Sequence, residues 1–192
     1  MNAVVAAVSH KRKPKNGVRF TMGTMQSIVL ITGGSRGIGA ATALAAANAG
    51  YAVAVNYAHN SLAADEVVRQ IRQQGGTAIT VQADVAEEAQ VLAMFDKVDA
   101  KLGRITGLVN NAGVVDHACR VADMSAERIR RMLNTNVLGS MLCAREAVRR
   151  MSTRYGGEGG SIVNVSSAAS RLGSPGQYVD YASAKGAIDA FT

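Results

Sequence analysis

Two tyrosines and a lysine lie close together in the stretch YVDYASAK, residues 178–185. In a helix, side chains four positions apart share a face, so Lys185 can place its charge beside Tyr181. Tyr178 has only Ala182 at that spacing, and we interpret it as an aromatic lining residue. A cation beside a phenol favours the phenolate, which suits proton transfer. Taken alone, however, the YxxxK spacing is more typical of a surface helix pair, so its meaning depends on other motifs.

A glycine-rich motif, TGGSRGIG at Thr32 to Gly39, stands where the first predicted strand turns into the first predicted helix. Glycines there let the backbone turn tightly and approach a pyrophosphate at the helix N-terminus. An isolated cluster equally fits an ordinary strand-to-helix turn, but the flanking strand, helix and second strand favour a nucleotide. The loop residues that we expect to bind a cofactor are Gly33, Ser35, Arg36, Gly37, Ile38 and Gly39.

The turn after the second predicted strand indicates which nicotinamide cofactor is preferred. An acidic residue in this turn would accept hydrogen bonds from the adenosine ribose. The turn reads NYAHN, so Asn56 and Tyr57 stand where the acid would be. Arg36 can reach a 2′-phosphate as a charge-assisted donor, although an exposed solubilising charge is the alternative interpretation. We therefore predict a preference for NADP(H), with NAD(H) as the alternative cofactor.

Alternating β-rich and helical runs position these motifs. Bounded apolar runs rich in branched residues are typical of strands buried on both faces, and they occur at 27–32, 52–56, 77–82, 107–110 and 161–165. Ser61 is expected to cap the second helix, and the stretch 125–151 is expected to be one long helix. This order predicts an α/β fold with parallel strands and right-handed crossovers.

Length, composition and charge narrow the class of protein. The chain has 192 residues, 48% hydrophobic and 18% charged, which is enough for one domain with a sizeable core. Residues 1–24 hold five lysines and arginines and no acidic residue. Of the formal net charge of +7, only +2 therefore belongs to residues 25–192. We expect 1–24 to be a basic, disordered extension and 25–192 to be the folded domain. The charge is therefore no sign of a nucleic-acid groove in that domain.

Cysteine usage and hydropathy favour a cytoplasmic protein. Cys119 and Cys143 form neither a CxxC pair nor a thiol metal cluster, which fits a reduced compartment and no metal site. The apolar run of the N-terminal segment precedes its basic cluster, the reverse of a secretory signal, and it is too short to span a membrane. Met25, directly before the first strand, is an alternative start of the chain.

In this order, the motifs resemble those of the classical short-chain dehydrogenases/reductases. The resemblance runs from about Met25 to the end of the sequence and implies a Rossmann-type, doubly wound parallel sheet. Each motif alone is weak, but the ordered set is highly specific. It comprises the TGxxxGxG loop, DV at Asp84 and Val85, NNAG at Asn110 to Gly113, NV with a following glycine at Asn136 to Gly139, a serine closing the fifth strand, and Tyr181 with Lys185.

The resemblance also implies which residues contact the cofactor. Asp84 would lie beside the adenine, and the NNAG motif would lie along the ribose and the central strand. The alternatives are an N-terminal charge favouring the next helix for Asp84, and a polar turn for NNAG. Besides the glycine loop and the turn after the second strand, the implied cofactor-binding residues are Asp84, Val85, Asn111, Ala112, Gly113, Tyr181 and Lys185.

The implied catalytic residues are Asn136, Ser167, Tyr181 and Lys185. Tyr181 would protonate the carbonyl oxygen as hydride arrives, while Lys185 would favour the phenolate and hold the ribose hydroxyls. Shifting a tyrosine by about three pKa units takes roughly 4 kcal/mol, and a charge about 4 Å away supplies roughly that at an effective dielectric of 20. Ser167 would donate to the substrate oxygen, with Ser166 as its rival. Asn136 would hold a water, or else be satisfied by nearby backbone.

Two functions stay open at this point. The first is an NADP(H)-dependent oxidoreductase acting on a small carbonyl or secondary alcohol, of the sugar dehydrogenase or 3-oxoacyl carrier-protein reductase kind. The second is a non-catalytic nucleotide-binding fragment or pseudoenzyme. Family members add two further strands after the Tyr-Lys helix, so we expect the sheet to be incomplete, with 161–165 as an exposed edge. The full-length form would be a homo-oligomer, a dimer or tetramer, through the helix of Met141, Leu142 and Cys143, for which core packing is the alternative.

Overall fold

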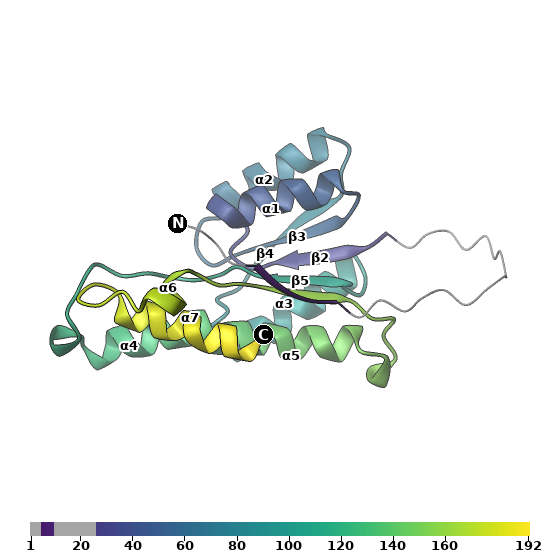
Figure 1. Ribbon diagram of the computed structural model, residues 1–192. Coiled ribbons are helices and arrows are strands. Elements are labelled where there is room, and N and C mark those ends of the chain that lie inside the picture. Colours follow the sequence, from purple (N-terminus) through teal and green to yellow (C-terminus); the bar gives the residue numbers. More distant parts are fainter. Residues whose placement is uncertain (1–4, 10–25) are drawn as a thin grey trace.

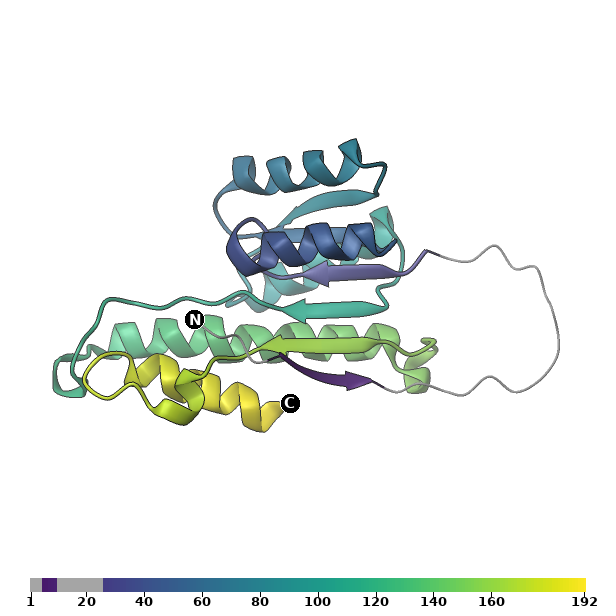
Figure 2. The same cartoon turned by 45° about the horizontal axis from the view of Figure 1, so that its top comes forward.

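The computed structural model describes residues 5–9 and 26–192, which form one six-stranded sheet with helices on both faces (Figure 1, Figure 2). In space the strands follow the order β1-β6-β5-β2-β3-β4, and the five from β2 to β6 are parallel. This is the order of a doubly wound sheet, which confirms the predicted Rossmann-type α/β fold. The strands are β1 (Val5–Ser9), β2 (Ile28–Ile31), β3 (Ala52–Tyr57), β4 (Ala78–Gln82), β5 (Gly107–Asn110) and β6 (Ser161–Val165).

Two helical layers bury the two faces of the sheet. The helices α1 (Gly37–Asn48) and α2 (Ser61–Gln73) pack on one face, and α3 (Glu88–Lys101) and α5 (Gly139–Met151) pack on the other. The first four residues of β3, 52–55, alternate between these cores, which explains why this part of the strand is apolar throughout. The predicted cap of α2 was wrong by one residue, because the side chain of Asn60, and not Ser61, accepts the hydrogen bond that caps the helix. Asparagine is as good an N-cap as serine.

The stretch 125–151 is helical, but it is not one regular α-helix. It consists of α4 (Ala126–Leu133), the π-helical segment η2 (Asn134–Leu138) and α5. Such π segments are rare and often mark functional sites, and this one contains Asn136. The remaining elements are the short helices η1 (Val121–Asp123), η3 (Thr153–Tyr155) and α6 (Ala169–Leu172), followed by α7 (Val179–Phe191).

The N-terminal strand β1 was not predicted. Its residues 5–9 lie inside the segment expected to be a disordered extension, whereas 1–4, 10–25 and the alternative start at Met25 lie outside the described residues. The strand pairs antiparallel with β6, from Val5 opposite Val165 to Ser9 opposite Ser161. The expectation that β6 is an exposed edge was therefore wrong, because β1 uses the hydrogen-bonding groups of that edge.

Three further features of residues 5–9 and 26–192 concern membranes, metals and the helix expected to form oligomer contacts. None of the helices there has the length and apolar character that crossing a membrane requires. No group of three or more His, Cys, Asp or Glu side chains is arranged to hold a metal ion in this part of the chain. Leu142 and Cys143 belong to the core under α5, and only Met141 of that trio is exposed.

Candidate cofactor and catalytic site

Three loops meet at the carboxyl ends of parallel strands, beside the point where the strand order reverses between β2 and β5. The glycine loop follows β2, the NNAG segment follows β5, and a pair of serines follows β6. In open α/β sheets, ligands bind at this edge and at such a switch point. The fold thus brings the motifs, which are far apart in the sequence, to the edge where ligands are expected.

The backbone of the glycine loop has a shape that only glycine fits. Gly33 and Gly37 have φ values of +60° and +54°, in the left-handed region. A Cβ on Gly39 would overlap the carbonyl oxygen of Gly33 and would lie 2.5 Å from Nδ2 of Asn111. Gly33, Gly37 and Gly39 therefore allow the tight backbone turn that the sequence predicted.

The first turn of α1 begins at this loop. Arg36 is its N-cap residue, is exposed, and makes no capping hydrogen bond with its side chain. Ser35 is half-buried and Ile38 is exposed. Because the first N–H groups of a helix have no acceptor within the helix, they can bind an anion. Arg36 lies beside these groups with its guanidinium at the surface.

Asn56 lies beneath the glycine loop and is only 2% exposed. Its Oδ1 accepts a hydrogen bond from the N–H of Gly33 at 3.1 Å. Its Nδ2 donates to the carbonyl oxygens of Val81 and Ala83, at 3.3 and 3.0 Å. Its amide is therefore used within the protein, to hold the loop. Of the predicted pair, only Tyr57 keeps a partly exposed side chain at this edge.

The NNAG segment is tied to the glycine loop by Thr32 and Asn111. Oγ1 of Thr32 accepts hydrogen bonds from the N–H groups of Asn111 and Ala112, both at 3.0 Å. Nδ2 of Asn111 donates to the carbonyl oxygens of Thr32 and Gly33, at 2.9 and 3.0 Å. The two loops therefore form one unit. Thr32 begins the glycine motif, but it was not predicted as a site residue.

Asp84 and Val85 occupy the turn after β4. Oδ1 of Asp84 accepts a hydrogen bond from the N–H of Ala86 at 2.9 Å, so the carboxylate shapes the turn before α3. Val85 is buried in the core, and a Cβ on Gly139 would approach its Cγ2 to 2.7 Å. Val85 is thus a core residue that packs against Gly139, whereas Asp84 is half-buried in the turn.

Asn136 is fully buried in η2 and forms hydrogen bonds with the backbone of Val114. Its Nδ2 donates to the carbonyl oxygen of Val114, and its Oδ1 accepts from the N–H of the same residue, both at 2.9 Å. A Cβ on Gly113 would lie 2.6 Å from Oδ1 of Asn136 and 3.8 Å from Nζ of Lys185. The side chain of Asn136 is thus satisfied by nearby backbone, and its place in the site is beside Gly113 and Lys185.

Tyr181 and Lys185 lie one turn apart in α7, as the spacing predicted. Nζ of Lys185 lies 5.7 Å from the centroid of the Tyr181 ring and donates a hydrogen bond to the carbonyl oxygen of Val165 at 2.7 Å. Burial lowers the pKa of Lys185, and the charge of Asp189 opposes this effect in part. Tyr178 is the N-cap residue of α7, so it stands at the start of the helix and apart from the pair.

The two serines after β6 have different partners. Ser166 is buried, and its hydroxyl donates to the carbonyl oxygen of Lys185 at 3.4 Å. Ser167 is half-buried, and its Oγ accepts a hydrogen bond from the N–H of Ala169 at 3.2 Å. That bond uses a lone pair and leaves the hydroxyl hydrogen of Ser167 for another acceptor. The arrangement therefore favours Ser167 over Ser166 as a donor to a substrate.

Two buried asparagines beneath the site were missed. Asn110 and Asn164 face each other in the register of β5 and β6, and Nδ2 of Asn110 donates to Oδ1 of Asn164 at 2.9 Å. Asn110 also donates to the carbonyl oxygen of Ser140, and Asn164 donates to Oγ1 of Thr192, both at 3.0 Å. They link both strands to α5 and α7. The available signal was that the apolar runs GLVN and SIVNV carry an asparagine at matching positions.

Comparisons with known proteins support this description. The sequence profile of the family described as "short chain dehydrogenase" matches residues 27–192. The Escherichia coli protein "Uncharacterized oxidoreductase YgfF" is 58% identical over 166 residues, which cover 86% of this chain and 67% of that protein. A 3-oxoacyl-[acyl-carrier-protein] reductase of Synechocystis is 41% identical over 165 residues, which cover 86% of this chain and 65% of that protein. This chain thus spans about two thirds of the length of these relatives.

Proposed function

This chain belongs to the short-chain dehydrogenase/reductase family of oxidoreductases, and we propose that it serves hydride transfer between NADP(H) and a small carbonyl or secondary-alcohol substrate. The observation that carries the proposal is the meeting of three segments at one edge of the sheet. A Cβ on Gly113 of the NNAG segment would lie within 4 Å of both Oδ1 of Asn136 and Nζ of Lys185, and Lys185 lies beside the ring of Tyr181. A proton donor and a cation thus lie next to the loops that suit a dinucleotide.

A nicotinamide dinucleotide fits the glycine loop, because the left-handed φ values of Gly33 and Gly37 and the close packing of Gly39 on Gly33 give the tight turn that a pyrophosphate-binding loop uses. When bound, the cofactor supplies or accepts the hydride. Asn56 would act indirectly by holding the loop, and Val85 by packing against Gly139 of α5. The residues that would hold the cofactor are Gly33, Ser35, Arg36, Gly37, Ile38, Gly39, Tyr57, Asp84, Asn111, Ala112, Gly113, Tyr181 and Lys185.

The chemistry assigned to this chain is a proton transfer at Oη of Tyr181. In the reducing direction the phenol gives its proton to the substrate oxygen, and in the oxidising direction it takes the proton back. Lys185, one turn away, stabilises the negative charge that the phenol acquires. Ser167 donates its hydroxyl hydrogen to the substrate oxygen as charge develops there. Asn136 keeps Gly113 and the following loop in place beside Lys185.

We attribute the preference for NADP(H) to Arg36 and to the absence of an acid after β3. Arg36 is exposed at the start of α1, where a guanidinium can bind a 2′-phosphate with two hydrogen bonds. Hydrogen bonds to charged groups contribute about 1.5 to 3 kcal/mol, so NADPH should bind at least about tenfold more tightly than NADH. The measurement is a pair of fluorescence titrations at one ionic strength. Equal dissociation constants would contradict the assignment.

The proposed function is tested by the consumption of NADPH in the presence of carbonyl compounds. Tyr181→Phe should reduce the rate by about 100-fold or more while leaving NADPH binding intact. Tyr178→Phe is the matched control, because this tyrosine lies three residues earlier and outside the helix, and it should keep the rate. NADPH binding without any carbonyl-dependent oxidation would instead support a non-catalytic nucleotide-binding protein.

We extend the proposal to the substrate, the oligomeric state and the cellular location of the protein. The name of the Synechocystis relative makes 3-oxoacyl thioesters the first substrates to assay, followed by sugars. We also propose a homo-oligomer in the cytoplasm, with contacts through the exposed apolar side chains of α4, η2 and α5, which light scattering on the purified protein would detect. These side chains are Ile129, Leu133, Leu138, Met141 and Val148.

A further inference from the structure

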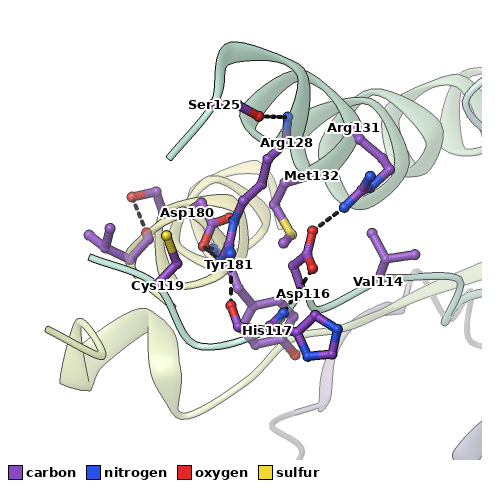
Figure 3. A network of polar contacts seen from close by, with 12 residues as sticks. Val114, Asp116, His117, Cys119, Ser125, Arg128, Arg131, Met132, Asp180 and Tyr181 are labelled. Atoms are coloured by element: carbon purple, nitrogen blue, oxygen red, sulfur yellow. Dashed lines mark hydrogen bonds and ion pairs between the residues drawn. The ribbon is translucent and has the colours of Figure 1, made fainter. Parts of the chain in front are cut away.

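A buried ion pair joins α4 to the start of α7, next to Tyr181 (Figure 3). Nε of Arg128 lies 2.8 Å from Oδ2 of Asp180, and Nη2 lies 3.3 Å from Oδ1. The two side chains are only 11% and 3% exposed. Two side-by-side bonds between a guanidinium and a carboxylate fix both the distance and the orientation of the partners.

Each partner of this pair also holds backbone. Nη1 of Arg128 donates to the carbonyl oxygen of His117 at 2.7 Å, in the loop after NNAG. Oδ1 of Asp180 accepts a hydrogen bond from the N–H of Tyr181 at 2.9 Å. The backbone of Arg128 is itself anchored, because Oγ of Ser125 accepts its N–H at 3.2 Å. One ion pair thus connects α4, the loop and the backbone of Tyr181.

The loop of residues 114–119 is fastened at further points as well. Arg131 of α4 forms an ion pair with Asp116, and the N–H of Cys119 donates to the carbonyl oxygen of Gln177 at 2.9 Å. Asn136 of η2 also forms hydrogen bonds with both backbone groups of Val114. Figure 3 shows the pairs of Arg131 with Asp116 and of Arg128 with Asp180, which lie between α4 and the first turn of α7. The loop therefore forms a fixed wall beside Tyr181.

Stability alone is a weak reason to bury an ion pair. The cost of removing two charges from water offsets their attraction, and apolar residues of similar volume often stabilise a fold equally well. A guanidinium–carboxylate pair instead provides a defined orientation. Burial opposes ionisation of Asp180, but the hydrogen bonds from Arg128 and from the N–H of Tyr181 outweigh it and lower the pKa of Asp180. Both partners are thus charged at neutral pH.

We propose that Arg128 and Asp180 are positioning residues that set the orientation of Tyr181. The inference rests on the proposed role of Tyr181 as the proton donor. The pair makes the first turn of α7 and the loop 114–119 move as one body with α4. The phenol is thereby held at a constant distance from Ser167 and from the substrate oxygen. Neither residue touches the reacting atoms; both act through the backbone of Tyr181.

The test introduces Arg128→Gln and Asp180→Asn into the naturally occurring form of the protein and compares both variants with Arg150→Gln. Arg150 is a matched control because it is similarly buried, at 13% exposed, and pairs with Asp99 at 2.6 Å between α3 and α5. Misplacing a catalytic group by about 1 Å can cost about 100-fold in rate, so Arg128→Gln and Asp180→Asn should lower kcat about 10- to 100-fold.

Three comparisons accompany that measurement. The dissociation constant of NADPH should stay within about twofold, since the pair does not touch the glycine loop. Arg128→Lys, which keeps the charge but not the paired geometry, should recover only part of kcat. Arg150→Gln should lower the melting temperature and leave kcat unchanged. An unchanged kcat in folded Arg128→Gln would overturn the proposal. If a single variant fails to fold, the double variant Arg128→Gln/Asp180→Asn replaces it, with the same criterion.

A second readout separates failure of this inference from failure of the proposed function. The NMR resonance of a ¹³C-labelled Tyr181 ring, assigned with Tyr181→Phe, reports the surroundings of the phenol whether or not the protein reduces a carbonyl. It should shift in Arg128→Gln and stay in place in Arg150→Gln. A shifted resonance in a protein without reductase activity would refute the proposed function and keep the positioning role. An unmoved resonance would refute the positioning role itself.

Discussion

Replacing Asn56 with aspartate tests whether this residue supports the glycine loop or faces the cofactor. From the sequence alone, the change would restore the acid that binds a ribose and would favour NADH. In the structure, Nδ2 of Asn56 donates to the buried carbonyl oxygens of Val81 and Ala83. An aspartate carboxylate has no hydrogen to give them. We therefore expect Asn56→Asp to destabilise the protein and not to change its cofactor.

The size of this effect follows from the two lost bonds. A buried polar group left without its partner costs about 1 to 3 kcal/mol, so the free energy of unfolding should fall by about 2 to 6 kcal/mol. The new charge, only 2% exposed at this position, adds a desolvation cost. In a domain of this size each kcal/mol lowers the melting temperature by about 2 to 4 °C, which predicts a decrease of at least about 4 °C. Since the loop loses its support, NADPH and NADH should both bind more weakly.

The assay is thermal unfolding followed by circular dichroism, with Asn60→Asp as the matched control. Asn60 lies four residues later and caps α2, where its Oδ1 accepts a hydrogen bond from the N–H of Ala63 at 3.0 Å. A carboxylate oxygen accepts this bond equally well, and its charge suits a helix N-terminus. The same chemical change should therefore leave the melting temperature of Asn60→Asp within about 1 °C of the unmodified protein.

The supporting role of Asn56 would be refuted if Asn56→Asp folds, keeps its melting temperature and binds NADH more tightly than NADPH. Tyr57→Asp provides the complementary case, because Tyr57 is partly exposed at the end of β3. An acid there should raise the affinity for NADH relative to NADPH without the loss of stability, as titrations with both cofactors would show.

Three further predictions concern other parts of the site. Gly39→Ala should abolish cofactor binding in fluorescence titrations, because a Cβ there overlaps the backbone of the loop, whereas Gly186→Ala, whose Cβ would meet open space on α7, should raise stability by about 0.5 to 1 kcal/mol. Arg36→Ala should weaken NADPH about tenfold or more and leave the dissociation constant of NADH unchanged. Burial lowers the pKa of Lys185, so between that lowered value and 10.5 the unfolded state keeps a proton that the folded state has released, and the free energy of unfolding rises with pH. Urea titrations from about pH 8 to 10.5 should show this rise in the unmodified protein and not in Lys185→Met.

The positions of the strands in the folded domain could be predicted because burial on both faces of a parallel sheet leaves a local signature. The runs GLVN and SIVNV were predicted at 107–110 and 161–165, and β5 and β6 have these bounds. The spacing of Tyr181 and Lys185 is equally local, since one helical turn places them together whatever surrounds the helix. The chemistry suggested by these patterns thus depended only on short stretches of sequence.

Two elements could not be predicted, because their causes are not local. The strand β1 exists only by pairing with β6, more than 150 residues later, and nothing in the alternation of its own residues identifies the partner. The π segment η2 depends on how one helix accommodates Asn136 beneath Val114 and how Gly139 packs on Val85. In both cases the surrounding fold decides the outcome.

The asparagines of the site show what residue type alone leaves undetermined. An asparagine offers two donors and an acceptor, which fits a cofactor hydroxyl and a protein backbone equally well. Asn56 and Asn111 were predicted to face the cofactor, and Asn136 to hold a water or else to bond nearby backbone. In the structure each amide is bonded to backbone of a neighbouring loop. Their spacing from the motifs was informative, but their partners depend on the fold.

Variants of residues that contact the cofactor and variants of residues that support the loop should affect NADPH and NADH differently. A residue that binds the 2′-phosphate directly, as proposed for Arg36, contributes to the affinity for NADPH alone. A residue that holds the loop, such as Asn56, shapes the backbone that both cofactors use, so its loss should weaken NADPH and NADH by the same factor. The ratio of the two affinities, and not either affinity alone, therefore distinguishes residues that contact the cofactor from residues that support the loop around it.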